Sequence, residues 1–224
     1  MFLKLLLRQQ LAVVLCFAVF VGLLLFAIGV WRNQTYDYWY LMPNLLLSVI
    51  PLVAALWLKR LLRTKLRRHW LPITATIVWL LFLPNSFYIV TDFIHLPESS
   101  RVDIVQDIVM LMQFSLLGLL FGYISLYIVH QEILKRHLVQ KLTASIVVSF
   151  VLLLCGFAIY IGRELRWNSW DILLHPLELA ESVALRFAHP VLYPESWSMT
   201  LSFFVFLTSI YFVGRQLATS KRES

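Results

Sequence analysis

Residues 11–31 read LAVVLCFAVFVGLLLFAIGVW and contain no charged side chain. A helix needs about 20 mostly apolar residues to cross the roughly 30 Å hydrocarbon layer of a bilayer. The stretch is longer than the apolar part of a secretory signal peptide, about 7–15 residues, and Trp31-Arg32-Asn33 follows it instead of a cleavage site of small residues. We therefore expect an uncleaved first membrane span.

The same length and composition criterion identifies six spans along the chain. The predicted spans are Leu11–Trp31, Leu41–Leu58, Trp70–Val90, Ile104–Val129, Leu142–Ile161 and Trp197–Leu217. Within the fourth span, Gly118-x-x-x-Gly122 is typical of a close approach between two membrane helices.

The longest connection, residues 162–196, lies between the fifth and sixth spans. Its part LLHPLELAESVALRFAH, residues 173–189, repeats apolar residues at helical spacing. This spacing predicts an amphipathic helix on the outer membrane surface. We therefore predict one all-α integral membrane domain over residues 1–224, a polytopic bundle of about six transmembrane helices with this amphipathic helix between spans five and six.

The composition excludes several classes of protein. Of the 224 residues, 60% are apolar and 14% are charged, and the mean hydropathy is +0.79. Soluble domains average about 45–50% apolar and roughly 25% charged residues, so a soluble enzyme and a disordered chain are both disfavoured. Both cysteines, Cys16 and Cys155, fall inside predicted spans, which argues against a disulfide scaffold and a cysteine-based metal site.

The net charge of +7 and the pI of about 9.6 suggest nucleic-acid binding at first sight. With six spans, however, 14 of the 19 Lys and Arg residues fall on one side of the membrane and five on the other. The positive-inside rule places the side with 14 in the cytoplasm, together with both termini. The run Lys59–Arg68 is then expected to contact anionic lipid headgroups, and no nucleic-acid partner is expected.

Polar side chains gather at the other, outer ends of the spans, where ten of the 12 acidic residues fall. The first cluster closes the third span and contains Asn85, Tyr88, Asp92 and His95. At 100° per residue these four side chains share one face of a helix, about 80° wide. Pro84 precedes them and removes a backbone hydrogen bond. A helix end with solvated polar residues would be the simpler interpretation.

Two more clusters flank the fourth and fifth spans. Asp103 and Asp107 open the fourth span, and a carboxylate one turn into an apolar run usually faces a partner or a watery cavity. The segment after the fifth span contains Arg163, Arg166, Trp167, Asn168 and Asp171. If the helix continued, both arginines would lie on one face with the tryptophans. Snorkelling arginines and interfacial tryptophans would explain the same pattern without a site.

We predict that these clusters form one outward-facing pocket. The candidate catalytic residues are Asp92, His95 and Asp107, with Asp92 or His95 as a general base. The candidate substrate-binding residues are Asn85, Tyr88, Asp103, Arg163, Arg166, Trp167, Asn168 and Asp171. The arginines would stabilise anionic charge. Asp92, His95 and Asp107 are also chemically suited to a divalent metal, but their spacing matches no strong signature, so no metal is assigned.

Two segments carry a resemblance to a known family. The segments LPNSFYIVTDFIH, residues 83–95, and GRELRWNSWDIL, residues 162–173, resemble an uncharacterised bacterial multi-pass membrane family, domain of unknown function 1361. The resemblance covers most of the chain from the second span onward. It implies a bacterial inner-membrane protein, and it supplies no substrate, reaction, cofactor or catalytic residue.

Three classes of function remain open from the sequence. The first is an enzyme that acts on a lipid-linked or envelope substrate in the outer pocket. The second is a small-molecule or ion transporter, because a proline-broken helix with polar residues resembles transporter sites, although no inverted repeat is detectable. The third is a non-catalytic scaffold or assembly factor, in which Asp–Arg contacts hold the bundle together. The sequence indicates neither a cofactor nor a protein partner.

Overall fold

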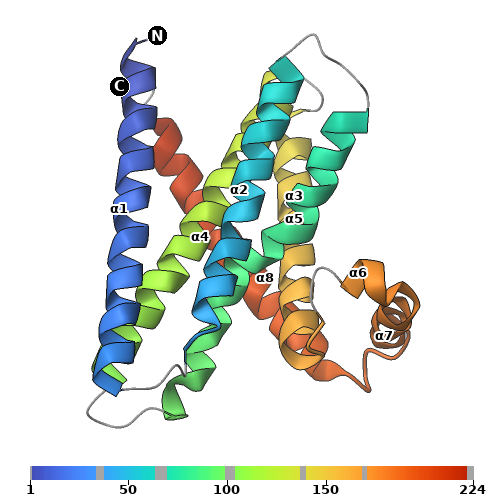
Figure 1. Ribbon diagram of the computed structural model, residues 1–224. Coiled ribbons are helices and arrows are strands. Elements are labelled where there is room, and N and C mark those ends of the chain that lie inside the picture. The colour runs from blue at the N-terminus through green and yellow to red at the C-terminus, as the bar shows by residue number, and fades with distance from the viewer. Residues whose placement is uncertain are drawn as a thin grey trace.

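The computed structural model describes residues 2–33, 38–63, 70–98, 104–136, 140–167 and 171–220, which contain helices and no strands. The long α-helices are α1 (Phe2–Asn33), α2 (Leu41–Arg63), α3 (Trp70–Tyr88), α4 (Ile104–Lys135), α5 (Lys141–Glu164) and α8 (Pro194–Ser220). A 3₁₀ helix, η1 (Ile89–Glu98), continues α3, and α6 (Asp171–Leu174) and α7 (Pro176–Ala188) lie between α5 and α8 (Figure 1). Six helices are long and apolar enough to cross a membrane, which confirms the six predicted spans and the all-α fold.

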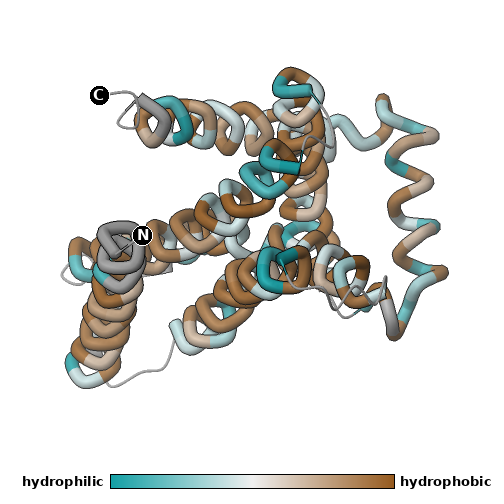
Figure 2. Tube along the Cα trace, turned by 90° about the horizontal axis from the view of Figure 1, so that it is seen from above, coloured by the Kyte–Doolittle hydropathy of each residue, from teal (hydrophilic) through white to brown (hydrophobic). Residues whose placement is uncertain are grey.

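The beginning of α1 and the end of α8 lie at the same end of the bundle, as six crossings require (Figure 1). Helices α6 and α7 lie at the opposite end, beside the bundle. Helix α7 is seen nearly end-on in Figure 1 and lengthwise in Figure 2, so it runs across the direction of the spans. Its mixture of apolar and polar residues is visible in Figure 2. The helix expected within residues 173–189 is therefore present, as α7.

The core lies among α2, α3, α4 and α5. Its fully buried side chains include Leu83 and Phe87 of α3, which pack with Leu126 of α4 and Leu152 of α5. Helix α1 lies at the edge of the bundle and packs mainly against α4. The apolar residues that remain on the outside match the hydrocarbon layer, because lipid replaces water around a membrane helix.

The two glycines of the Gly118-x-x-x-Gly122 motif let α4 approach α3 closely. A Cβ atom on Gly118 would lie 2.5 Å from the carbonyl oxygen of Ser86, and one on Gly122 would lie 2.6 Å from Cε1 of Phe87. Real Cβ atoms essentially never come this near another heavy atom. The interpretation of the motif as a helix-packing device is therefore confirmed.

Hydrogen bonds between side chains and neighbouring helices hold α2, α3 and α4 in register. Ser86 Oγ on α3 donates a hydrogen bond of 2.8 Å to the carbonyl of Ser48 on α2. Trp79 Nε1 on α3 donates one of 3.2 Å to Ser125 Oγ on α4. Hydrogen bonds between membrane helices contribute about 0.6 kcal/mol each on average. Together with the contacts of Gly118 and Gly122, these hydrogen bonds fix the C-terminal half of α3, from which η1 continues.

A buried acidic residue anchors the end of the bundle where α1 begins. The carboxylate of Glu132 lies 3.4 Å from Arg63 Nη2, 3.8 Å from Lys135 Nζ and 4.0 Å from Arg136 Nε. Glu132 is buried, whereas Arg63 and Lys135 are about half exposed. The arrangement connects α2 to α4 and leaves positive charge facing outward at this end.

Candidate functional site

The first polar cluster lies where α3 changes into the 3₁₀ helix η1. The single α-helical face predicted for Asn85, Tyr88, Asp92 and His95 is wrong in its geometry, because the α-helix ends at Tyr88. In a 3₁₀ helix, side chains three residues apart eclipse each other, so Asp92 and His95 still point to one side. The Thr91 hydroxyl donates to the carbonyl of Tyr88 at 2.7 Å, and this local bond accompanies the change of helix type.

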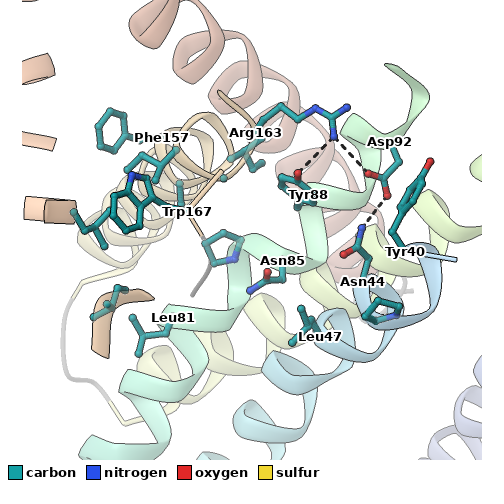
Figure 3. Close-up of a pocket in the computed structure, with 18 of the residues that line it drawn as sticks. Tyr40, Asn44, Leu47, Leu81, Asn85, Tyr88, Asp92, Phe157, Arg163 and Trp167 are labelled. Atoms are coloured by element: carbon teal, nitrogen blue, oxygen red, sulfur yellow. Dashed lines mark hydrogen bonds and ion pairs between the residues drawn. The ribbon is translucent and has the colours of Figure 1, made fainter. Parts of the chain in front are cut away.

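A cavity of about 720 Å³ lies beside this cluster, between α2, α3, η1, α5, α6 and α7. Its volume is within the roughly 300–1,000 Å³ that small-molecule sites occupy. The polar and aromatic residues that line it are Trp39, Tyr40, Asn44, Asn85, Tyr88, Asp92, His95, Phe157, Arg163 and Trp167. The other lining residues are apolar side chains and Gly162. Figure 3 shows Arg163, Tyr88, Asp92 and Asn44 together at one end of the cavity.

Arg163, at the end of α5, is the centre of the polar group. Its Nη1 lies 3.9 Å from Asp92 Oδ1 and 3.5 Å from the Tyr88 hydroxyl. Its Nη2 lies 3.4 Å from His95 Nε2. These separations exceed the 2.7–2.9 Å of a tight charge-assisted hydrogen bond, so the guanidinium is surrounded without being tightly held.

Asp92 is only 1% exposed, yet it lines the cavity. Asn44, in the first turn of α2, donates a hydrogen bond of 3.2 Å to Asp92 Oδ2. The two oxygens of Asp92 therefore have different neighbours, the amide on one side and the guanidinium on the other. Such a carboxylate is held in place while keeping lone pairs for a ligand.

The His95 ring packs against Tyr40, with 4.9 Å between ring centroids. Because a guanidinium can only donate, an Arg163–His95 hydrogen bond requires Nε2 of His95 to be an acceptor, with the imidazole neutral and its proton on Nδ1. The position of the proton on the His95 ring is thus inferred from its hydrogen-bond partner, Arg163.

Gly162 allows α5 to approach the first cluster. A Cβ atom on Gly162 would lie 3.3 Å from Cε2 of Tyr88, which is tighter than ordinary contact. The absence of a side chain therefore brings Arg163 within reach of Tyr88 and η1.

Sequence reasoning missed the residues that α2 and the segment before it contribute. Asn44, Tyr40 and Trp39 all line the cavity. The available signal was Asn44 itself, because an amide inside the apolar run of the second span is expensive unless it has a partner. The two aromatic residues carry no signal that separates them from an ordinary interfacial belt.

Asp107 is buried as expected, but it has a different partner. Its Oδ2 accepts a hydrogen bond of 3.0 Å from the Tyr38 hydroxyl, and it does not line the cavity. Its neighbours on α4 attach α1 instead. Gln106 accepts a bond of 2.8 Å from Arg32, and Gln113 Nε2 donates one of 2.8 Å to the carbonyl of Ala18. The second cluster therefore joins helices, and Asp107 is not among the residues that line the cavity with Asp92.

The third cluster is divided by the end of α5. The helix ends at Glu164, and Arg166 takes the left-handed backbone conformation with φ of 59°. The helix therefore does not continue through Arg166, the condition under which both arginines would share a face, and the Arg166 side chain is exposed and does not line the cavity. Trp167 does line it, whereas Asp171, at the start of α6, does not. Asp103 and Asn168 lie outside the described residues.

The metal alternative needs three ligands in one place. Among the described residues, no group of three His, Cys, Asp or Glu side chains is close enough to hold a metal ion. Asp92 and His95 share the cavity, but Asp107 is bonded to Tyr38 instead. What the site does offer is a carboxylate, an imidazole, a guanidinium and amides around a partly apolar cavity.

No curated protein and no solved structure was found to match this chain. A family described as "Protein of unknown function (DUF1361)" matches residues 43–210. The match contains α2 from Pro43, all elements from α3 to α7 and most of α8, and therefore every residue of the cavity from Pro43 onward, whereas α1 lies outside it. Because the match spans more than half of the chain, this six-span helical protein belongs to the DUF1361 family.

Proposed function

We propose that this chain is a bacterial inner-membrane protein that acts on a lipid-linked or envelope substrate in the cavity beside η1. The observation that carries the proposal is the gathering of Asp92, His95 and Arg163 at one end of a cavity with otherwise mostly apolar walls. Ligand sites commonly combine an apolar lining with a few convergent polar groups. The three charged or titratable side chains come from η1 and α5.

The proposed orientation places this cavity on the outer side of the membrane. The opposite end of the bundle carries the outward-facing positive charge of Arg63 and Lys135, and basic residues favour the cytoplasmic side. The same residues are suited to anionic lipid headgroups of the cytoplasmic leaflet. Both termini are then cytoplasmic, and the cavity meets the outer leaflet.

The proposed chemistry is a proton transfer. Asp92 is the general base, because Asn44 holds one of its oxygens and leaves lone pairs of the carboxylate for a substrate hydroxyl or water. Arg163 stabilises negative charge that develops on the substrate, which a guanidinium does best at a site shielded from water. His95 positions Arg163 through its Nε2 atom.

The Asp92→Asn variant tests this proposal. Purified protein, reconstituted in vesicles of total bacterial envelope lipid, is incubated, and the lipids are compared by mass spectrometry. We expect the native chain to convert at least one species and Asp92→Asn to lower the rate by about 100-fold or more, because general-base catalysis contributes 10²–10⁴-fold. The amide keeps the shape of the carboxylate and can still hydrogen-bond.

The matched control is Glu181→Gln, which neutralises an exposed acid on α7 that does not line the cavity. We expect this variant to convert lipids at the native rate. Equal rates for Asp92→Asn and the native chain would contradict the assignment of Asp92, and no conversion by the native chain in any envelope extract would contradict the enzymatic proposal.

A further inference from the structure

The cavity is asymmetric along its length. Its polar end contains Arg163, Asp92 and Asn44, whereas Leu81 and Phe157 lie away from that end (Figure 3). Two side chains of α7, Leu179 and Val183, add to the apolar wall. A cavity with one polar end and a long apolar wall is complementary to an amphiphile, because each part of the molecule finds a matching surface.

Helix α7 is a side wall of this cavity and not a part of the core, because none of its residues is buried. Its attachments to the spans lie near its C-terminal end. Arg186 Nε donates a hydrogen bond of 3.2 Å to the Tyr160 hydroxyl, and the Phe187 ring lies 5.2 Å from the rings of both Phe157 and Trp197. Leu179 and Val183, one turn apart, face the cavity from the part of the helix that precedes Arg186.

The other side of α7 faces away from the protein and is apolar in part. Leu177 is 83% exposed, and Val191 and Leu192, just beyond the helix, are 87% and 70% exposed. In a helix that runs across the spans at one end of the bundle, such residues match the acyl region of the adjacent leaflet (Figure 1). Helix α7 therefore lies between the cavity and the side on which these exposed apolar residues face.

The polar end favours an anionic head. Arg163 carries five N–H donors, and its described neighbours lie 3.4–3.9 Å from its guanidinium nitrogens. A ligand oxygen can therefore form shorter hydrogen bonds to the guanidinium than these neighbours do. A guanidinium matches the paired oxygens of phosphate. Asp92 is the one acidic side chain among the described lining residues, and Asn44 already holds its other oxygen.

We propose that the ligand of this cavity is a lipid with a phosphate-type head, which binds at Arg163 with its hydrocarbon chain between α7 and the spans. This inference rests on the proposed function for the location of the site, and it does not require that Asp92 be catalytic. A glycerophospholipid and a lipid-linked phosphate share this chemistry.

The test separates head from chain. The chain, purified in a neutral detergent, is titrated with dodecyl phosphate, dodecanol and inorganic phosphate, and bound ligand is counted by native mass spectrometry. We expect dodecyl phosphate to bind at least tenfold more tightly than dodecanol, and inorganic phosphate to show no binding at the same concentrations. Phosphatidic acid and farnesyl phosphate then distinguish the two lipid sources.

Two pairs of variants locate each part of the ligand. Arg163→Gln should weaken dodecyl phosphate by about tenfold or more and leave dodecanol unchanged, and retained dodecanol binding shows that the variant is folded. Val183→Trp should weaken both ligands, because the indole fills the space for the chain. The controls are Arg32→Gln, an exposed arginine outside the cavity, and Leu177→Trp, on the opposite side of the same helix.

The proposal would be overturned by binding of inorganic phosphate as tight as that of dodecyl phosphate. It would also fail if Arg163→Gln kept the native preference for phosphate over alcohol, or if Leu177→Trp and Val183→Trp had equal effects. The ligand titrations could fail while envelope lipids are still converted in an Asp92-dependent way. That result would leave the proposed function intact and would exclude only the phosphate head group and the position of the hydrocarbon chain proposed here. Binding of a phosphate lipid without any conversion would support this ligand and contradict the proposed enzymatic function.

Discussion

Replacing Gly118 by alanine is expected to destabilise the bundle by about 2 kcal/mol or more, because an overpacked core typically loses roughly 1–3 kcal/mol of stability. The added methyl group would lie 2.5 Å from the carbonyl oxygen of Ser86 and 3.1 Å from Cδ1 of Ile89. A backbone atom cannot rotate away as a flexible side chain can, so α3 and α4 must separate. The measurement is the thermal midpoint of unfolding in detergent, with helix content followed by circular dichroism.

The same substitution at Gly214 is the matched control. Apart from its chain neighbours and the nearby backbone of its own helix, no heavy atom of the described residues lies within 4 Å of a Cβ atom at that position, so alanine meets open space. We expect Gly214→Ala to leave the midpoint unchanged or slightly raised, because alanine is the better helix former. Equal midpoints for Gly118→Ala and the native chain would show that the close approach of α3 to α4 does not support the fold.

The spans were predictable because the bilayer imposes a length and an apolar composition on each of them. The packing motif was predictable for a similar reason, since Gly118 and Gly122 occupy one face of α4 and only a side chain as small as glycine permits the contact with α3. These features depend on local composition and spacing, which the sequence contains directly.

The candidate site was predictable only in part. Asp92 and His95 keep the same side in an α-helix and in a 3₁₀ helix, because residues three apart are separated by only about 60° in the first and eclipse each other in the second. The sequence therefore predicts their proximity even though the helix type changes at Ile89. Their contact with Arg163 joins segments 68 or more residues apart, and no local pattern encodes it.

The sequence does not indicate which of the two arginines, Arg163 or Arg166, lines the cavity. Both lie in the same motif, and a continued helix would aim both at the same partners. The chain instead leaves the helix after Glu164, and Leu165 and Trp167 both donate backbone hydrogen bonds to the carbonyl of Ile161. Arg166 then adopts a positive φ that usually belongs to glycine, so its own residue type gives no warning of the turn.

Replacing Arg163 by leucine is expected to destabilise the protein by about 3 kcal/mol, because breaking a buried ion pair from one side leaves the other charge uncompensated. The side chain of Asp92 is 2% exposed and that of Arg163 is 15% exposed. Without the guanidinium, the carboxylate retains Asn44 as its described hydrogen-bond donor. One neutral amide does not replace the hydration that the carboxylate loses on burial.

The double variant Arg163→Leu/Asp92→Asn distinguishes this reason from a simple loss of packing. Removing both charges leaves no uncompensated ion, so we expect the double variant to be more stable than Arg163→Leu alone, by about 1 kcal/mol or more, within the range of couplings between contacting residues. Free energies of unfolding from denaturant titrations in mixed micelles give the comparison, and Arg166→Leu, at an exposed position, should change them by less than about 0.5 kcal/mol. Strict additivity of the two single changes would show that Asp92 and Arg163 act independently. In that case the separation of 3.9 Å between them would be proximity without coupling, and Arg163 would be free to bind a ligand with no cost to Asp92.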